Sequence, residues 1–222
     1  MRSFMVSTHK IPATTAPVPV GEQRVTLHDV SWESYEKILE ALGNKRSALL
    51  SYYKGTLEIT SPLEEHESSS SRIDQFINLL TEEGSMNLKS MQSTTLNKPT
   101  LKVGSEPDQC YYIANELQVR GKKVDLKTDP PPDLIVEVDI THTDINKNRL
   151  CAEIEVPEFW RYDGDRLTIY QLQGGEYQDV EASPTFPGVP KEKLYEFLND
   201  CTQQGETQAK RNLRIWVREQ LG

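Results

Sequence analysis

The segment LIVEVDI, residues 134–140, follows three consecutive prolines and Asp133 and decides how this chain folds. Its apolar, β-branched side chains predict a strand. Because side chains along a strand alternate between the faces of a sheet, Glu137 and Asp139 share one face with Ile135. Burying two unpaired carboxylates would cost several kcal/mol, so that face needs compensation. A bound divalent cation would supply it, whereas a strand at the sheet edge with a wet face would need none. The pattern leaves both explanations open.

Two Pro-Asp pairs compete to supply a further carboxylate. Asp133 is four residues from Glu137, which is roughly 13 Å along a strand at ~3.3 Å per residue. Magnesium binds its oxygen ligands at about 2.1 Å. Asp133 is therefore expected to mark the entrance of the strand. Asp108, in Glu106-Pro107-Asp108, is expected to join Glu137 if its strand lies alongside.

The pattern of apolar residues around this segment predicts an α/β fold, with helices packed on a mixed sheet. Ser31 and Gly43 bracket the first expected helix, and Thr143 is expected to cap the helix that follows the decisive strand. The expected helices span residues 32–42, 64–80, 144–154, 191–199 and 207–221. The expected strands span residues 48–53, 56–60, 87–96, 109–114, 134–140, 158–162, 167–172 and 177–180.

Composition limits the class of protein. The 222 residues, 36% hydrophobic and 27% charged, suffice for one domain. Residues 1–24 are expected to form an N-terminal arm and residues 25–222 a single domain. The sequence contains no run of about 18 apolar residues, so no segment is expected to span a membrane. Three widely spaced cysteines argue against a disulfide framework and favour the reducing cytoplasm.

The net charge of −9 repels nucleic acid at long range, although a local basic surface or bound metal ions could offset it. Lys210, Arg214 and Arg218 recur every four residues and line one face of the last helix. That face could track phosphates, or it could be an ordinary solvated face. The apolar residues beside it could form a dimer contact or belong to the core.

An ordered set of motifs links the chain to a known family. The motifs are Glu106-Pro107-Asp108, the segment PDLIVEV at 132–138, Lys147, and VPEFW at 156–160. This set resembles the Uma-type nucleases, a large bacterial family of predicted restriction endonucleases once catalogued as a domain of unknown function. That family belongs to the PD-(D/E)XK superfamily. The resemblance extends over about residues 25–198 and includes the GxLxIxSP stretch at 55–62 and His66.

The resemblance implies a restriction-endonuclease-like mixed β-sheet flanked by α-helices and a Mg²⁺ (or Mn²⁺) site. Asp108 and Glu137 would match the acidic residues of the superfamily motif, and the backbone carbonyl of Val138 would complete the metal ligands. Position 139 should be lysine and is Asp139. The lysine is expected instead at Lys147 in the following helix, unless Lys147 is only a surface residue. Asp139 could bind a second ion or accept a hydrogen bond from Lys147.

Three further residues are candidates for outer contacts with such a site. Glu65 and His66 lie near the start of the second helix, and Glu58 lies on an upstream strand. Alternatively, His66 and also His142 are polar histidines at the surface. For Glu58 the alternative is a position on a solvent-exposed strand face.

The function implied is a metal-dependent endonuclease that hydrolyses phosphodiester bonds in DNA and works as a homodimer. The alternative is a catalytically degenerate protein of the same fold that binds nucleic acid or protein, which the missing lysine at position 139 and the negative charge favour. An enzyme that acts on a small phosphorylated compound is a third reading.

Overall fold

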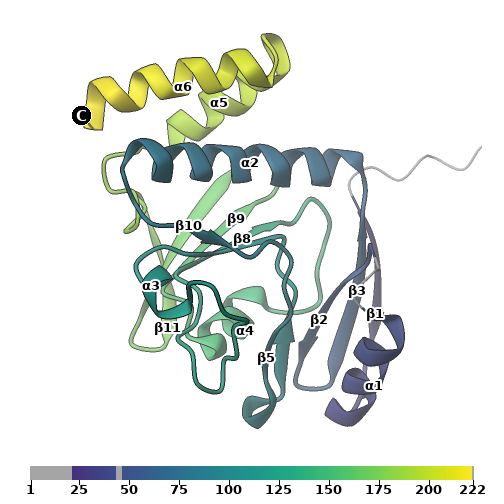
Figure 1. Cartoon of the computed structure of the whole chain (residues 1–222). Helices are drawn as coiled ribbons and strands as arrows, with labels where there is room; N and C mark the ends of the chain where they lie inside the picture. The colour runs from purple at the N-terminus through teal and green to yellow at the C-terminus, as the bar shows by residue number, and fades with distance from the viewer. Residues whose placement is uncertain (1–21, 44–46, 222) are drawn as a thin grey trace, which may run out of the picture.

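The computed structural model describes residues 22–43 and 47–221, and its strands form two sheets (Figure 1). One sheet has five strands in the order β1-β3-β2-β6-β5, and the other has six in the order β11-β10-β9-β8-β7-β4. The first is built from β1 (Glu22–Leu27), β2 (Leu49–Tyr53), β3 (Thr56–Pro62), β5 (Leu96–Lys98) and β6 (Val103–Ser105). The second is built from β4 (Lys89–Ser90), β7 (Gln109–Tyr112), β8 (Leu134–Val138), β9 (Glu158–Tyr162), β10 (Leu167–Gln173) and β11 (Glu176–Val180).

Six α-helices and one 3₁₀ turn complete the described chain. They are α1 (Trp32–Leu42), α2 (Glu64–Glu83), η1 (Pro99–Leu101), α3 (Glu116–Val119), α4 (Lys147–Ile154), α5 (Lys191–Gln203) and α6 (Glu206–Leu221). The β8–β9 pair is parallel and the other pairs of the six-stranded sheet are antiparallel. The expected α/β class, a mixed sheet flanked by helices, is confirmed.

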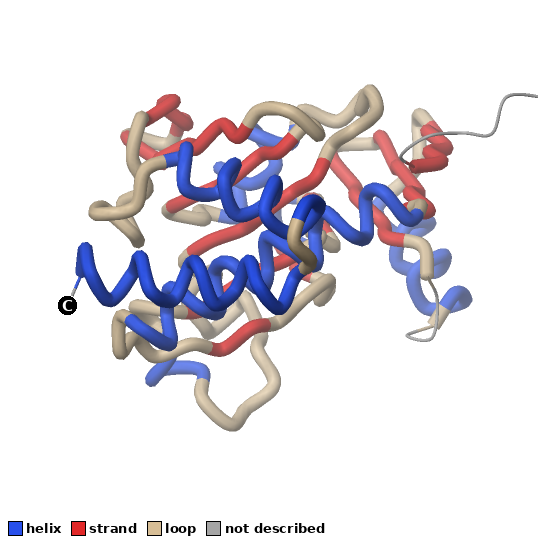
Figure 2. The backbone as a smooth tube through the Cα atoms, turned by 90° about the horizontal axis from the view of Figure 1, so that it is seen from above, coloured by secondary structure: helices blue, strands red, loops and turns tan. Residues whose placement is uncertain are grey.

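Strand β8 is buried on both faces. Leu134, Val136 and Val138 pack in the core cluster that also holds residues of α2, α5 and α6. Figure 1 shows α2 crossing one side of the sheet with α5 and α6 beyond it, and Figure 2 shows these helices from above. Ile135 points to the opposite face and packs with residues of α4 such as Leu150. The alternation read from the sequence therefore places Glu137 on the face covered by α4.

The five-stranded sheet carries its own smaller core. Trp32 and Tyr35 of α1 pack against Tyr52 of β2, with ring centroids about 5 Å apart. The Ser31 side chain caps α1 by accepting from the backbone N–H of Ser34, and Gly43 ends the helix at a positive φ of 65°. Both caps were expected from the sequence.

Two expected elements are corrected by the structure. The helix expected over residues 144–154 begins at Lys147, because Asn146 caps it and the hydroxyl of Thr143 donates to Glu58 instead. The strand expected over residues 87–96 is divided between β4 and β5, which belong to different sheets.

The expected N-terminal arm, residues 1–24, lies outside the described residues as far as position 21. Its last three residues begin β1, which pairs with β3 in a register that sets Arg24 opposite Thr60. Cys110, Cys151 and Cys201 are free and buried, in line with the expectation of no disulfide framework. Within residues 22–43 and 47–221, no helix is long and apolar enough to cross a membrane.

Candidate active site

The C-terminal end of β8 lies inside the sheet, between β7 and β9. Glu137 is 4% exposed and Asp139 is 6% exposed. The explanation that these carboxylates sit on a wet edge face is therefore wrong, and their charges need partners inside the protein.

Asp108 lies directly across from Glu137. The antiparallel register pairs Gln109 with Val136, so continuing it by one residue sets Asp108 opposite Glu137. Opposed side chains on one face have Cβ atoms about 4.5–5.5 Å apart. The backbone N–H of Val138 donates to Asp108 Oδ2 at 2.7 Å, and this bond holds the carboxylate at the end of β8. The expected meeting of Asp108 and Glu137 on neighbouring strands is what the structure has.

Lys147 reaches inward from the first turn of α4. Its Nζ lies 2.9 Å from Glu137 Oε1 and 3.2 Å from Ser51 Oγ of β2. The side chain is 6% exposed. The reading of Lys147 as a surface lysine is therefore wrong, and its ammonium stands beside the two acidic residues.

The charges of this cluster act on one another. Burial, together with the charges of Asp108 and Asp139, outweighs the opposing effect of the Lys147 ammonium and raises the pKa of Glu137 to about 8. Burial alone would lower the pKa of Lys147, but the negative charges of Glu137 and Asp139 outweigh it and raise that pKa. Burial and the neighbouring charges thus act in opposite directions on Lys147, and the charges prevail there.

Asp139 is held by two arginines. Arg161 Nε lies 2.9 Å from Asp139 Oδ2, and Arg24 NH2 lies 3.3 Å from Oδ1. Both of its oxygens thus have guanidinium partners, and no hydrogen bond joins Asp139 to Lys147 among the described residues. Asp139 follows the last residue of β8, and its ion pairs connect this end of the strand to Arg161 and Arg24.

Sequence reasoning missed Arg24, Arg161 and Ser51 as members of the site. Arg161 could have been found from the parallel β8–β9 pairing, which sets it opposite Glu137. Arg24 lay in the segment expected to be an arm, and Ser51 lies in the other sheet, so neither carried a signal without the tertiary arrangement.

Glu58 anchors the loop that leads into α4. It is fully buried, and its carboxylate accepts from the backbone N–H groups of Asp144 and Ile145 and from the hydroxyl of Thr143. Arg24 NH1 lies 2.7 Å from Glu58 Oε2 and so links Glu58 to Asp139. The wet strand face considered for Glu58 is wrong, and Glu58 acts on the site by fixing the loop before Lys147.

The two residues near the start of α2 differ in position. His66 is buried, with Nε2 3.3 Å from Asp108 Oδ2, so the surface alternative is wrong for it. The Glu65 side chain is exposed, and its backbone carbonyl accepts from Ser68. His142 is exposed, 3.3 Å from Asp144. Of these, only His66 joins the site.

Asp133 has the role expected from its distance to Glu137. Its carboxylate accepts from the backbone N–H groups of Ile113 and Asn115 and from the Asn115 amide. It fixes the entrance of β8 at the end remote from Glu137.

The chemistry of the donor atoms suits one divalent cation. A cavity of about 10 Å³, lined by Asp108, Glu137, Val138 and Lys147 among others, has room for about one water molecule or one ion. Asp108 and Glu137 each use one oxygen in the hydrogen bonds described and leave the other without one among the described residues. No three His, Cys, Asp or Glu side chains of residues 22–43 and 47–221 form a metal-binding group. Magnesium commonly needs only one or two protein carboxylates beside water and substrate phosphates.

Two arginines of the basic face of the last helix form ion pairs at the surface. Arg214 and Arg218 both contact Glu83 at the end of α2, and Glu206 at the start of α6 pairs with Arg72. Arg218 stays 66% exposed while it pairs with Glu83, so phosphate tracking and an ordinary solvated face both stay predictions.

Comparisons with known proteins place this chain in a family. The Uma2 family model, described as "Putative restriction endonuclease", matches residues 32–198. The chain belongs to the Uma2 family. The resemblance read from its motifs is confirmed, and the match includes Asp108, Glu137 and Lys147. No curated protein matches the chain.

A solved structure supports the fold of this Uma2-family chain. The crystal structure of "a putative nuclease belonging to DUF820" from Anabaena variabilis ATCC 29413 is similar to it with a TM-score of 0.54 and 16% sequence identity. The similarity covers 75% of this chain and 97% of that one. The chain thus shares the overall fold of that structure.

The Lys147–Glu137 pair gives a stability prediction. Lys147→Met should lower the free energy of unfolding by about 3–5 kcal/mol, because it leaves Glu137 buried beside two other carboxylates. Adding Glu137→Gln should recover part of that loss. The measurement is urea unfolding in EDTA. Lys54→Met, which removes the ammonium of a half-exposed pair with Glu153, serves as the control and should cost less than about 1 kcal/mol. Equal losses in Lys147→Met and Lys54→Met would refute the buried pair.

Glu58 gives a prediction on pH. Burial opposes its ionisation, but hydrogen bonds from Thr143 and the charge of Arg24 outweigh it and lower the pKa of Glu58 below 4.5. The ionised group therefore stabilises the fold above that pH, and its contribution is lost as the pH falls through the lowered pKa. Glu58→Gln should be less stable by about 2 kcal/mol at pH 7, with a difference that shrinks below pH 4.5. The exposed Glu67→Gln should show no such trend, and a Glu58→Gln deficit that is constant down to pH 3 would contradict this account.

Proposed function

We propose that this Uma2-family chain is a metal-dependent endonuclease that hydrolyses phosphodiester bonds in DNA. The observation that carries the proposal is the burial of Asp108, Glu137 and Lys147 together at the end of β8. Two carboxylates and an ammonium around a cavity of ion size suit phosphodiester hydrolysis, which needs a cation, a positioned water and charge stabilisation on phosphorus.

Asp108 and Glu137 would hold Mg²⁺ or Mn²⁺ through their remaining oxygens, together with the backbone carbonyl of Val138. A divalent ion there would supply Lewis-acid chemistry and lower the pKa of a bound water. The bond from the Val138 N–H fixes Asp108 for this role, and His66 supports the same carboxylate from α2. Burial, aided by the charges of Asp108 and Asp139, raises the pKa of Glu137, and a cation bound there would stabilise its ionised form.

Lys147 would orient the attacking water and stabilise charge that develops on the phosphate oxygens. Its ammonium now offsets Glu137 and touches Ser51. A cation bound to Glu137 would share the negative charge of its carboxylate. The Lys147 ammonium could then also interact with the phosphate from its present position. Its place on α4 would compensate for Asp139 at the position where the superfamily carries lysine. Attack in line with the leaving oxygen would release a free 3′-hydroxyl.

The surroundings of the site fit this activity. Arg161 is 34% exposed at the side chain while it pairs with Asp139, so its guanidinium lies at the border between the site and solvent. We place the protein in the cytoplasm, where buried free thiols persist. We also propose a homodimer, because cutting both strands of a duplex needs two sites. Ile215 on α6, 57% exposed, is an apolar residue available for that contact.

The test is cleavage of plasmid and single-stranded DNA in millimolar Mg²⁺ or Mn²⁺. Glu137→Gln and Lys147→Met should each lower the rate at least about 100-fold, because the first weakens binding of the cation and the second removes the ammonium that acts on the reacting phosphate. Glu67→Gln and Lys54→Met, matched changes at exposed positions, should keep the wild-type rate. Circular dichroism checks that each variant is folded.

Two results would count against an endonuclease. Folded wild-type protein that cleaves neither DNA nor RNA with either ion would favour the catalytically degenerate protein instead. Cleavage of dinucleotides without cleavage of polymers would point to a small phosphorylated substrate.

A further inference from the structure

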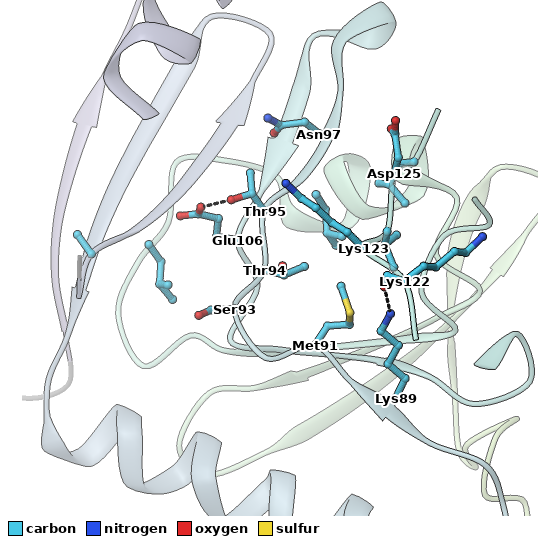
Figure 3. Close-up of a pocket in the computed structure, with 15 residues that line it drawn as sticks. Lys89, Met91, Ser93, Thr94, Thr95, Asn97, Glu106, Lys122, Lys123 and Asp125 are labelled. Carbon is cyan, nitrogen blue, oxygen red and sulfur yellow. Dashed lines mark hydrogen bonds between the residues drawn. The ribbon is translucent and has the colours of Figure 1, made fainter. Parts of the chain in front are cut away.

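A second, much larger cavity adjoins the candidate active site. It has a volume of about 550 Å³ and opens between the segment that enters β5 and the loop 122–126 (Figure 3). Small-ligand sites commonly have volumes of about 300–1,000 Å³. Leu49 and Glu106 line both this cavity and the cavity that holds Asp108, Glu137 and Lys147. A ligand in the larger pocket would therefore lie next to the candidate catalytic groups.

Glu106 forms a fixed partition between the two cavities. Its carboxylate accepts from the backbone N–H of Leu50 and from the hydroxyl of Thr95, which Figure 3 marks with a dashed line. It is 3% exposed and two residues before Asp108. The pocket wall and the candidate catalytic residue Asp108 therefore belong to the same short segment of the chain.

The lining of the pocket combines polar groups with apolar side chains. Ser93, Thr94 and Asn97 supply hydroxyl and amide groups, while Met91 and Leu126 supply apolar surface. Asn97 accepts from the Tyr35 hydroxyl through Oδ1, which leaves its amide NH₂ as a donor. This mixture suits a flat heterocycle with polar edges better than a purely apolar ligand.

Three lysines border the pocket, but two of them are engaged. Lys89 donates to the carbonyls of Val119 and Lys122, and the Lys122 ammonium pairs with Asp129 at 2.6 Å. Lys123 is exposed and extends across the pocket toward Thr95 and Asn97 (Figure 3). Among the described lining residues, Lys123 is thus the cation best placed to meet an anionic ligand.

We propose that this pocket binds one unpaired nucleotide of the strand being cut, beside the scissile phosphate. The Lys123 ammonium pairs with a phosphate of that nucleotide, the polar groups of residues 93–97 bond its base and sugar, and the apolar side chains cover its base. A base inside a duplex is stacked and cannot enter such a pocket, so the nucleotide is single-stranded or turned out of the helix. The inference rests on the proposed endonuclease function and narrows its substrate to nucleic acid with an unpaired nucleotide at the cut.

The test measures binding without catalysis. A fluorescein-labelled oligothymidylate of about ten nucleotides is titrated in EDTA and followed by fluorescence anisotropy. Lys123→Met should weaken binding about tenfold, and Ser93→Trp, which fills the pocket, should weaken it at least as much. Lys127→Met removes an exposed lysine of the neighbouring loop that does not line the pocket, and should change the Kd less than about twofold. The same strand annealed to its complement should bind more weakly and respond less to Ser93→Trp.

The outcomes separate this inference from the proposed function. Wild-type affinity in both Lys123→Met and Ser93→Trp overturns the pocket, and it does so even if the protein cleaves DNA. If both variants weaken binding but the protein cleaves no nucleic acid, the nucleotide-binding role of the pocket is supported and the proposed endonuclease activity is rejected. Duplex that binds as tightly as the single strand, with equal sensitivity to Ser93→Trp, also overturns the inference.

Discussion

Three carboxylates buried at the end of β8 set the main constraint on this structure. Asp108, Glu137 and Asp139 repel one another in a region of low dielectric, and each has a partner of its own. Asp108 takes a backbone N–H, Glu137 takes Lys147, and Asp139 takes two arginines. The backbone N–H comes from β8 itself, and the cationic side chains come from α4, β9 and β1, so the elements around β8 offset the charge of these carboxylates.

The same requirement joins the two sheets. Ser51 and Glu58 belong to the five-stranded sheet, yet Ser51 contacts Lys147 and Glu58 holds the loop that leads into α4. Arg24 of β1 connects Glu58 with Asp139. The smaller sheet therefore supports the candidate active site, and it also forms part of the larger pocket through Leu49.

Much of this could be predicted from the sequence because the signals were local. Alternation along residues 134–138 placed Glu137 correctly, and the distance argument separated Asp133 from the site. The start of α4 was misjudged because Thr143 is a good cap by type, but the buried Glu58 competes for its hydroxyl. Arg161 follows only once β8 is paired with β9, and Arg24 and Ser51 reach the site from the other sheet, a tertiary arrangement that no local pattern encodes.

The central claim is that Asp108 and Glu137 converge to hold one divalent ion beside Lys147. A crystal soaked in Mn²⁺ and measured for anomalous scattering tests it most directly. The account predicts one strong anomalous peak within about 2.3 Å of an oxygen from each carboxylate, with the Lys147 ammonium nearby but outside the coordination sphere. Anomalous density elsewhere, or none between these carboxylates at millimolar Mn²⁺, would contradict it.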